Sequence, residues 1–514
     1  MIFSSPVIFR LSALLAAVML LGGCALPPPG PRPASQLLSV QQAADTRLGR
    51  ALSQRLADRP EGVSGVYPLA EPLNAFSARA LLAEGADKTL DVQYYIWADD
   101  TIGRLLFRTL HDAAERGVRV RLLLDDNGIA GLDESLAALD AHRNIEIRLF
   151  NPFPIRTPKW LGYLWDFPRL NRRMHSKSFT VDGQATIIGG RNVADEYFGA
   201  NPQSRFADLD VLALGPAARE VNQEFDRYWA SAPAYPVKKL LPEVQDPEAV
   251  LDELLEPSDN AGRYRDALEQ SDFLERLLDE SLEMTWAQVD VISDDPEKVL
   301  GDVHKDRLMS RQLAAALDDP RSSVTLVSPY FIPGDAGVDL FAELEARGVD
   351  VTVLTNSLAA NDVALVHSGY AKYRRALLDA GVTLFETRRA ATGGGKQPRA
   401  GVMSSAASSL HAKTFAVDGE VLFIGSLNFD PRSTHLNTEI GFLIESPELA
   451  ADMESAFDNE VPQNAYQVML EDGELRWQET RDGEPVTHHR EPETGFFKRF
   501  WVKIFSLLPL EPLL

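Results

Sequence analysis

Cysteine is almost absent: Cys24 is the only one in this chain of 514 residues. No disulfide can therefore form within the chain. Positive charge is also scarce: 51 Lys and Arg stand against 75 Asp and Glu, which leaves a net charge of −24. This acidity argues against a general nucleic-acid binder, whose surface must be basic to meet phosphates. Apolar residues make up 45% and charged residues 25%, which is the composition of a globular protein with a large core.

A membrane span is not evident at the start of the chain. Arg10 precedes an apolar run over residues 11–21, which has the length of a signal-peptide core and is short for a bilayer. The run ends in Leu-Gly-Gly-Cys24, which resembles a bacterial lipoprotein cleavage box. That resemblance implies that residues 1–23 are a signal peptide and that Cys24 carries a lipid anchor. A cleaved secretion signal, or an anchor helix with Cys24 incidental, is the alternative.

The expected location is therefore the bacterial cell envelope, with the protein lipid-anchored and facing the periplasm. In proteobacterial lipoproteins an Asp after the cysteine usually means retention in the inner membrane. Ala25 stands there instead, which favours the outer membrane slightly. Residues 24–60 are expected to be a lipid-anchored, Pro-rich tether, since PPPGPRPAS is stiff and has little to bury.

The rest of the chain repeats itself. Residues 175–192 read HSKSFTVDGQATIIGGRN and residues 411–428 read HAKTFAVDGEVLFIGSLN, so 9 of 18 positions are identical. Each is preceded by a strand, an amphipathic helix and a second strand, which predicts two copies of one α/β unit. We expect two pseudo-symmetric α/β domains, each a mixed sheet flanked by helices, with the active site at their interface. The predicted ranges are 61–235 for the first domain, 236–300 for an acidic connecting insertion, 301–465 for the second domain and 466–514 for a C-terminal tail that meets the membrane interface.

Both copies carry H-x-K-x4-D, followed by Gly and Asn 14 and 17 positions after the histidine. The Asp-Gly pair predicts a hairpin, and the period of two puts His and Lys on one face of its entering strand. Lysine and amide groups stabilise phosphoryl oxygens, while histidine can attack phosphorus or carry a proton. The residues concerned are His175, Lys177, Asp182 and Asn192 in the first copy and His411, Lys413, Asp418 and Asn428 in the second.

A metal site is the competing interpretation of these motifs. Lysine is a poor metal ligand, and the carboxylate or Cys/His clusters that hold metals are missing, so we expect no metal and no cofactor. In a single copy, the bland interpretation would be a core histidine and a surface lysine in an ordinary hairpin. Two copies at identical spacing make that interpretation improbable.

The paired motifs resemble those of the phospholipase D superfamily. Other stretches, among them DVQYYIW, SPYFIPG and LNTEIGF, resemble its bacterial cardiolipin synthase branch, especially the third, periplasm-facing type. The resemblance extends from about residue 60 to the end of the chain. It implies an enzyme that transfers a phosphatidyl group between phospholipids and makes cardiolipin from phosphatidylglycerol, with phosphatidylethanolamine as a possible co-substrate. A hydrolytic phospholipase D that releases phosphatidic acid, another phosphodiesterase such as a nuclease, and a non-catalytic lipid-binding scaffold are the alternatives.

The resemblance also implies a role for each motif residue. One histidine forms a covalent phosphohistidine and the other acts as acid and base; we favour His175 as the nucleophile and His411 as the acid/base, with the reverse open. The catalytic set is His175, Lys177, Asp182, His411, Lys413 and Asp418, and the phosphate-binding set is Lys177, Asn192, Lys413, Ser426 and Asn428.

The family has a carboxylate bonded to each histidine. Glu439 fits that place for His411, and Asp210 is the expected counterpart for His175. Much of the role of Asp182 and Asp418 is expected to be structural, since both stand in hairpin turns. The expected partners are phospholipid substrates and a membrane surface, with no nucleic acid; whether an accessory protein is needed stays open. Residues 159–173 and 496–510 mix aromatic and basic side chains, as interfacial segments do.

Overall fold

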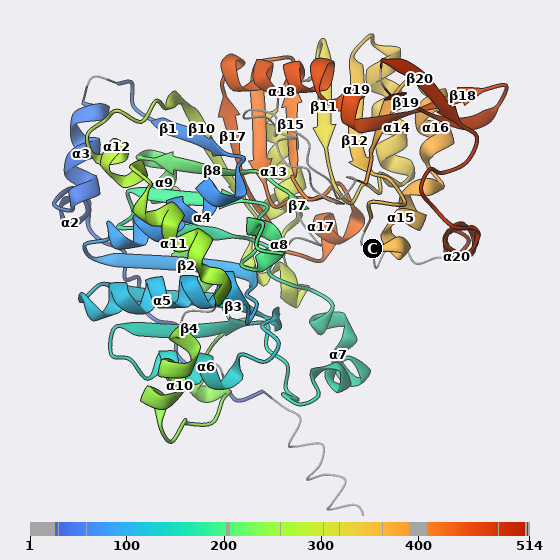
Figure 1. Ribbon diagram of the computed structural model, residues 1–514. Helices are drawn as coiled ribbons and strands as arrows, with labels where there is room; N and C mark the ends of the chain where they lie inside the picture. Colours follow the sequence, from blue (N-terminus) through green and yellow to red (C-terminus); the bar gives the residue numbers. More distant parts are fainter. Residues whose placement is uncertain are drawn as a thin grey trace, which may run out of the picture.

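The computed structural model describes residues 26–511 apart from residues 29, 58, 202–205, 257–258, 302, 318, 362, 390–408, 482 and 509–510. The expected signal peptide and Cys24 lie outside the described residues. Within the described residues, one continuous sheet of 18 strands runs through the molecule, and helices cover it (Figure 1). The predicted mixed α/β class is confirmed.

The first half of the sheet is built around parallel strands whose apolar residues fill the main core. β2 (Thr89–Ile96), β3 (Arg119–Gly128) and β4 (Ile145–Phe150) are parallel, and β2 pairs antiparallel with β5. The order in this half is β9–β4–β3–β2–β5–β6–β8–β1. The remaining strands are β1 (Val63–Leu69), β5 (Ser178–Val181), β6 (Ala185–Gly189), β8 (Asp210–Leu214) and β9 (Ala234–Pro236).

The second half has the same strand order in the opposite direction, from the junction outward. It runs β10–β17–β16–β15–β11–β12–β13–β18 and is extended by β19 and β20. Its strands are β10 (Thr285–Ser293), β11 (Ser323–Val327), β12 (Asp350–Asn356), β13 (Thr383–Thr387), β15 (Thr414–Val417), β16 (Val421–Gly425), β17 (Ile440–Glu445), β18 (Ala465–Glu471), β19 (Glu474–Arg481) and β20 (Glu484–His488).

The two halves join through backbone hydrogen bonds, because β1 pairs with β10 over residues 63–66 and 285–288. Strand β2 therefore corresponds to β11, β5 to β15, β6 to β16 and β8 to β17. A short parallel pair also crosses between the halves, formed by β7 (Phe206–Ala207) and β14 (Ser409–Leu410). A shared apolar cluster fills the junction, with Val66, Val211, Phe442 and Ile444 fully buried.

Strand alternation explains how helices cover both faces of the first half. Leu90 and Val92 of β2 enter the core that α4 and α5 complete. Asp91, which points the other way, accepts a hydrogen bond from Asn222 of α9 at 2.6 Å. Helix α5 begins where the Asp100 carboxylate accepts the Gly103 amide, a standard N-cap. The helices up to residue 229 are α2 (Val40–Ala44), α3 (Arg47–Leu56), α4 (Pro72–Glu84), α5 (Thr101–Glu115), α6 (Asp133–Asp140), α7 (Tyr163–Leu170), α8 (Asp195–Phe198) and α9 (Pro216–Trp229).

The connecting segment and the second half carry the remaining helices. Helices α10 to α12 belong to the predicted acidic insertion, and α14 and α18 correspond in chain order to α5 and α9 of the first half. They are α10 (Pro247–Leu255), α11 (Gly262–Glu269), α12 (Phe273–Leu278), α13 (Met309–Ala316), α14 (Gly334–Ala346), α15 (Ala364–Ala371), α16 (Arg374–Asp379), α17 (Pro431–His435), α18 (Pro447–Asn459), α19 (Val461–Asn464) and α20 (Phe496–Phe505).

Three expected boundaries differ from the structure. The tether expected over 24–60 contains helices α2 and α3, whose Leu48 and Leu52 are buried in the main core. The insertion expected over 236–300 includes strand β10, which sits at the centre of the sheet. The tail expected from residue 466 begins with strands that extend the sheet. The physical reason is the same each time: these segments carry apolar residues that the neighbouring elements bury. None of the helices among the described residues is long and apolar enough to cross a membrane.

Candidate active site

The repeated motifs form the two predicted hairpins, β5–β6 and β15–β16, which turn at Asp182 and Asp418 with φ of 52° and 55°. Each turn carboxylate accepts hydrogen bonds from three consecutive backbone amides, residues 87–89 in the first copy and 321–323 in the second. Seven residues of extended chain, roughly 20 Å, separate each carboxylate from its histidine. Both carboxylates therefore anchor the hairpins, away from the histidines.

The carboxylates that contact the histidines come from the opposite halves of the chain. Nδ1 of His175 lies 2.8 Å from Oε2 of Glu439, and Nδ1 of His411 lies 2.6 Å from Oδ2 of Asp208. The backbone crosses over in the same way, because the His175 amide donates to Thr438 and the His411 amide donates to Ala207. Each motif is thus bonded to the opposite half of the chain at the junction.

The expected carboxylate pairing is wrong in two respects. Glu439 serves His175, not His411, and Asp210 contacts neither histidine. Asp210 lies 2.7 Å from Nη2 of Arg79 and 3.3 Å from Nη1 of Arg191, so two buried guanidinium groups hold it. Its role is to fix the end of β8.

A signal for Asp208 was present in the strand register. Gly189 pairs with Asp210 across β6 and β8, while the corresponding Gly425 pairs with Gly441 across β16 and β17. The residue two positions before Gly441 is Glu439, so its counterpart is Asp208, two positions before Asp210. The sequence alone does not give this register, because the loops before β8 and β17 differ in length.

The residue that follows each hairpin differs between the copies, being Gly190 in the first and Ser426 in the second. Each of the two accommodates the carboxylate beside it. A Cβ at Gly190 would lie 2.0 Å from Oδ1 of Asp208, so only glycine leaves room for that side chain. The second copy has Ser426 there, whose Oγ donates to Oε2 of Glu439 at 2.6 Å. Ser426, expected to bind phosphate, instead holds the carboxylate that contacts His175.

The two lysines lie beside the histidines of their own motifs. Nζ of Lys177 donates to the His175 carbonyl at 2.5 Å, and Nζ of Lys413 lies 3.0 Å from Nδ1 of His411. Burial, together with the charge of Lys413, lowers the pKa of Lys177 to about 7, while Glu439 opposes the shift. Two ammonium groups close enough to affect each other make a site that attracts an anion.

Both imidazoles are neutral near pH 7. Burial lowers the pKa of His175 to about 4, with Glu439 opposing the shift. Burial and the charge of Lys413 lower the pKa of His411 to about 3, with Asp208 opposing. Each lysine acts on both histidines, which places the two pairs in one electrostatic environment. A neutral imidazole whose Nδ1 donates to a carboxylate leaves the lone pair of Nε2 available.

The orienting carboxylates stay ionised in spite of their burial. Burial alone would raise both pKa values, but contact with His411 and the charges of Lys413 and Arg191 hold the pKa of Asp208 at about 2. In the same way, His175 and Lys177 keep the pKa of Glu439 below its usual range. Each carboxylate can therefore stabilise a positively charged ring during a reaction.

The two asparagines differ in their contacts. The Asn192 amide accepts from the Ile96 backbone at 3.2 Å and donates to the Tyr197 hydroxyl at 2.9 Å, and the Tyr197 ring centroid is 5.1 Å from that of His411. Asn192 thus supports the ring that packs on His411. Asn428 is buried, and its Oδ1 has no hydrogen-bond partner among the described residues. The side chain of Asn428 thus keeps an unpaired acceptor oxygen, which leaves it hydrogen-bonding capacity that the described residues do not use.

The donor set fits phosphoryl chemistry. Within the described ranges, no group of three or more His, Cys, Asp or Glu side chains could hold a metal ion. What the site offers is two imidazoles with carboxylate partners, two ammonium groups and a buried amide. This set suits a nucleophile, an acid/base and donors to an anionic phosphodiester.

Comparison of the sequence with known proteins points to the same chemistry. The chain matches the family described as "Cardiolipin synthase, PLD-like domain" over residues 81–229 and 313–461, where PLD stands for phospholipase D. It is 45% identical over 472 residues to cardiolipin synthase C of Escherichia coli (strain K12), covering 91% of this chain and 100% of that one. It is also 30% identical to an uncharacterized protein of Helicobacter pylori (strain J99), covering 90% of this chain and 92% of that one.

A solved structure supports the fold. The crystal structure of phosphatidylserine synthase from Haemophilus influenzae Rd KW20 superposes with a TM-score of 0.54 at 14% identity, covering 91% of this chain and 100% of that chain. The two matched ranges fall one in each half of the sheet, and each contains one histidine motif. The chain therefore belongs to the phospholipase D-like cardiolipin synthase family.

Proposed function

We propose that this enzyme transfers a phosphatidyl group from one phospholipid to a hydroxyl group of another, and so makes cardiolipin from phosphatidylglycerol. The observation that carries the proposal is the crossed pairing of two His–carboxylate pairs around two lysines at one junction. The 45% identity to a cardiolipin synthase over nearly the whole chain supports the lipid substrate.

The reaction proceeds in two displacements at phosphorus. In the first, Nε2 of His175 attacks phosphorus, the bond to the headgroup oxygen breaks, and His411 gives a proton to the departing alcohol. In the second, His411 takes the proton of the acceptor hydroxyl, the new P–O bond forms, and the P–N bond to His175 breaks. An anionic phosphodiester raises the pKa of a neighbouring imidazole, which lets His411 carry that proton.

Other groups in the site bind and orient the phosphate. Lys177 and Lys413 hold the phosphoryl oxygens, and Asn428 donates to one of them. Glu439 and Asp208 fix the ring tautomers. Phosphatidylethanolamine is the proposed second donor, with ethanolamine as its leaving group.

The proposed location is the periplasmic side of the cell envelope, with Cys24 acylated and the outer membrane as host. Helix α20 supports contact with a lipid surface: Phe496, Phe497 and Trp501 are exposed, and the helix carries three basic and no acidic residues. Basic and aromatic side chains on one short helix suit the boundary between headgroups and acyl chains.

The test is purified protein with phosphatidylglycerol, alone and with phosphatidylethanolamine labelled in its headgroup, analysed by lipid mass spectrometry. We expect cardiolipin with release of glycerol or ethanolamine, and no product from the His175→Ala protein. If phosphatidic acid is the sole product, the enzyme is a hydrolase and the proposed transfer is wrong. If the protein cleaves DNA and forms no lipid product, it is a nuclease.

A further inference from the structure

A group of exposed apolar side chains lies just before the first histidine motif. It occupies the 3₁₀ helix η1 (Lys159–Gly162) and α7, which projects from the first half of the molecule in Figure 1. Trp160 is 61% exposed, Leu164 70%, Trp165 59% and Phe167 43%. Soluble proteins rarely leave such residues together in water, so this group, the α7 patch, marks an interaction surface.

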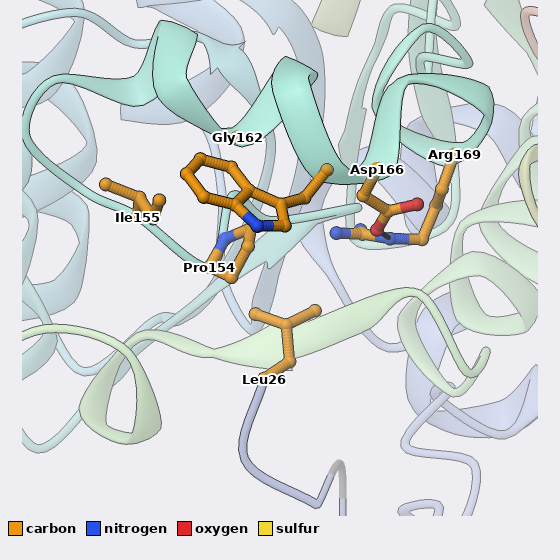
Figure 2. A pocket seen from close by; sticks show the side chains of 7 residues that line it. Leu26, Pro154, Ile155, Gly162, Asp166 and Arg169 are labelled. Carbon is orange, nitrogen blue, oxygen red and sulfur yellow. Dashed lines mark hydrogen bonds and ion pairs between the residues drawn. The ribbon is translucent and has the colours of Figure 1, made fainter. Parts of the chain in front are cut away.

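Leu26, the first described residue of the chain, lies at the α7 patch. Leu26 lines a cavity of about 260 Å³ together with Pro154, Gly162 and Trp165. Figure 2 shows Leu26 pointing toward Pro154 and the α7 segment. The following residues contact the body of the protein through an exposed ion pair between Arg32 and Glu297 at 2.7 Å and a hydrogen bond from Lys239 to the Pro28 carbonyl at 3.2 Å. The segment therefore lies along the molecule, and its first described residue sits beneath α7.

The position of Leu26 indicates which surface the α7 patch contacts. The acyl group proposed on Cys24 is attached two residues before Leu26, and two residues of chain reach at most about 7 Å. Acyl chains proposed on Cys24 would therefore start within reach of Leu26 and the α7 patch. Lys159 of η1 and Arg169 of α7 form ion pairs with Asp126 and Asp166, so the exposed surface of the patch is mainly aromatic and aliphatic. Exposed tryptophans beside aliphatic side chains suit the boundary between lipid headgroups and acyl chains.

A short series of contacts links the α7 patch to the catalytic centre. Tyr163 of α7 donates from its hydroxyl to Asn127 at 3.3 Å, and Asn127 donates to the Tyr95 hydroxyl at 3.3 Å. The ring centroid of Tyr95 is 5.1 Å from that of His175. A phospholipid at the base of α7 thus has its headgroup close to the proposed nucleophile.

We propose that the α7 patch inserts into the same leaflet as the acyl chains of Cys24, and that the substrate phospholipid passes from that leaflet along α7 to His175. This inference rests on the proposed function and specifies where the lipid enters. It assigns a role to Trp160, Leu164, Trp165 and Phe167 that the reaction chemistry does not require.

The first test asks whether the α7 patch enters the bilayer. The acylated protein is bound to vesicles of phosphatidylglycerol and phosphatidylethanolamine with brominated acyl chains, which quench only nearby tryptophans. We expect the Trp160→Phe/Trp165→Phe protein to lose at least half of the wild-type quenching. Trp286→Phe is the matched control, because Arg59 packs over that ring at 4.0 Å on β10. Unchanged quenching in the double variant would overturn the proposal.

The second test asks whether lipid delivery depends on the α7 patch. Transfer is measured in vesicles and in detergent micelles for Leu164→Ser/Trp165→Ser, with Leu340→Ser of α14 as control, a leucine 49% exposed. We expect the vesicle-to-micelle ratio of activity to fall at least tenfold in the double variant and to stay unchanged in the control. An equal loss in both media would overturn the proposal. A wild-type protein that forms no product in either medium would refute the proposed function, while the quenching result would still decide bilayer insertion.

Discussion

Nδ1 of His411 lies 2.6 Å from Oδ2 of Asp208, a residue 203 positions earlier in the other half of the chain. The corresponding contact between His175 and Glu439 spans 264 positions. Neither motif is complete within its own copy. The imidazole and the ammonium group come from one half, and the carboxylate that sets the tautomer comes from the other.

Replacing Asp208 separates its role from that of Asp210. We expect Asp208→Asn to lower kcat by about 10³-fold, because the amide no longer stabilises a charged His411 ring. Asp210→Asn breaks a buried contact with Arg79 and is expected to cost about 3–5 kcal/mol of stability, with kcat of the folded fraction within a few-fold of wild type. Thermal unfolding and transfer kinetics check both. A larger loss of kcat in Asp210→Asn would contradict the assignment.

The identity of the nucleophile is tested with an activated donor, a phosphatidyl ester of nitrophenol, whose leaving group needs no proton. In His411→Ala we expect a phosphatidyl group to accumulate on His175, because the second displacement lacks its base. Mass spectrometry of the proteolysed protein locates the label. Accumulation on His411 in His175→Ala, with none on His175 in the converse variant, would reverse the roles.

The pH dependence of kcat/KM reports groups of the free enzyme, and with the nitrophenol ester, whose leaving group needs no proton from His411, these groups are His175 and Lys177. His175 must be neutral to attack, and its pKa is lowered to about 4, so activity falls as the pH decreases through about 4. Lys177 must be protonated to hold the phosphate, and its pKa is lowered to about 7, so activity falls as the pH rises above about 7. In Lys177→Arg the alkaline fall is expected to move upward by at least one pH unit, at a lower maximum. An unmoved alkaline limb in initial-rate profiles would exclude Lys177 as its source.

Gly190 tests the space that the Asp208 carboxylate needs. An added Cβ would lie 2.0 Å from Oδ1 of Asp208, so Gly190→Ala is expected to displace the carboxylate and lower kcat at least about tenfold. Gly262→Ala is the matched control, since a Cβ there meets nothing within 4 Å. Comparable kinetics for the two variants would show that Asp208 tolerates the displacement.

The sequence predicted the parts of the fold and the site that depend on local pattern. The alternation in SFTV and TFAV and the Asp-Gly turns gave both hairpins, and the repeat gave two similar halves. The carboxylate pairing did not follow, since it depends on the segments just before β8 and β17 meeting the opposite motifs, a contact between residues more than 200 positions apart. The helices α2 and α3 were missed because the Pro-rich stretch before them dominated the composition of residues 24–60.

The β1–β10 ladder has a consequence for the chemistry of each half. Either half alone would hold a histidine without its carboxylate, so the ladder that joins the halves is also what completes both motifs. Because both halves belong to one chain, their sequences need not be the same. Asp208 stands beside Gly190 on one side and Glu439 beside Ser426 on the other, which gives the two imidazoles different surroundings and allows each a separate task.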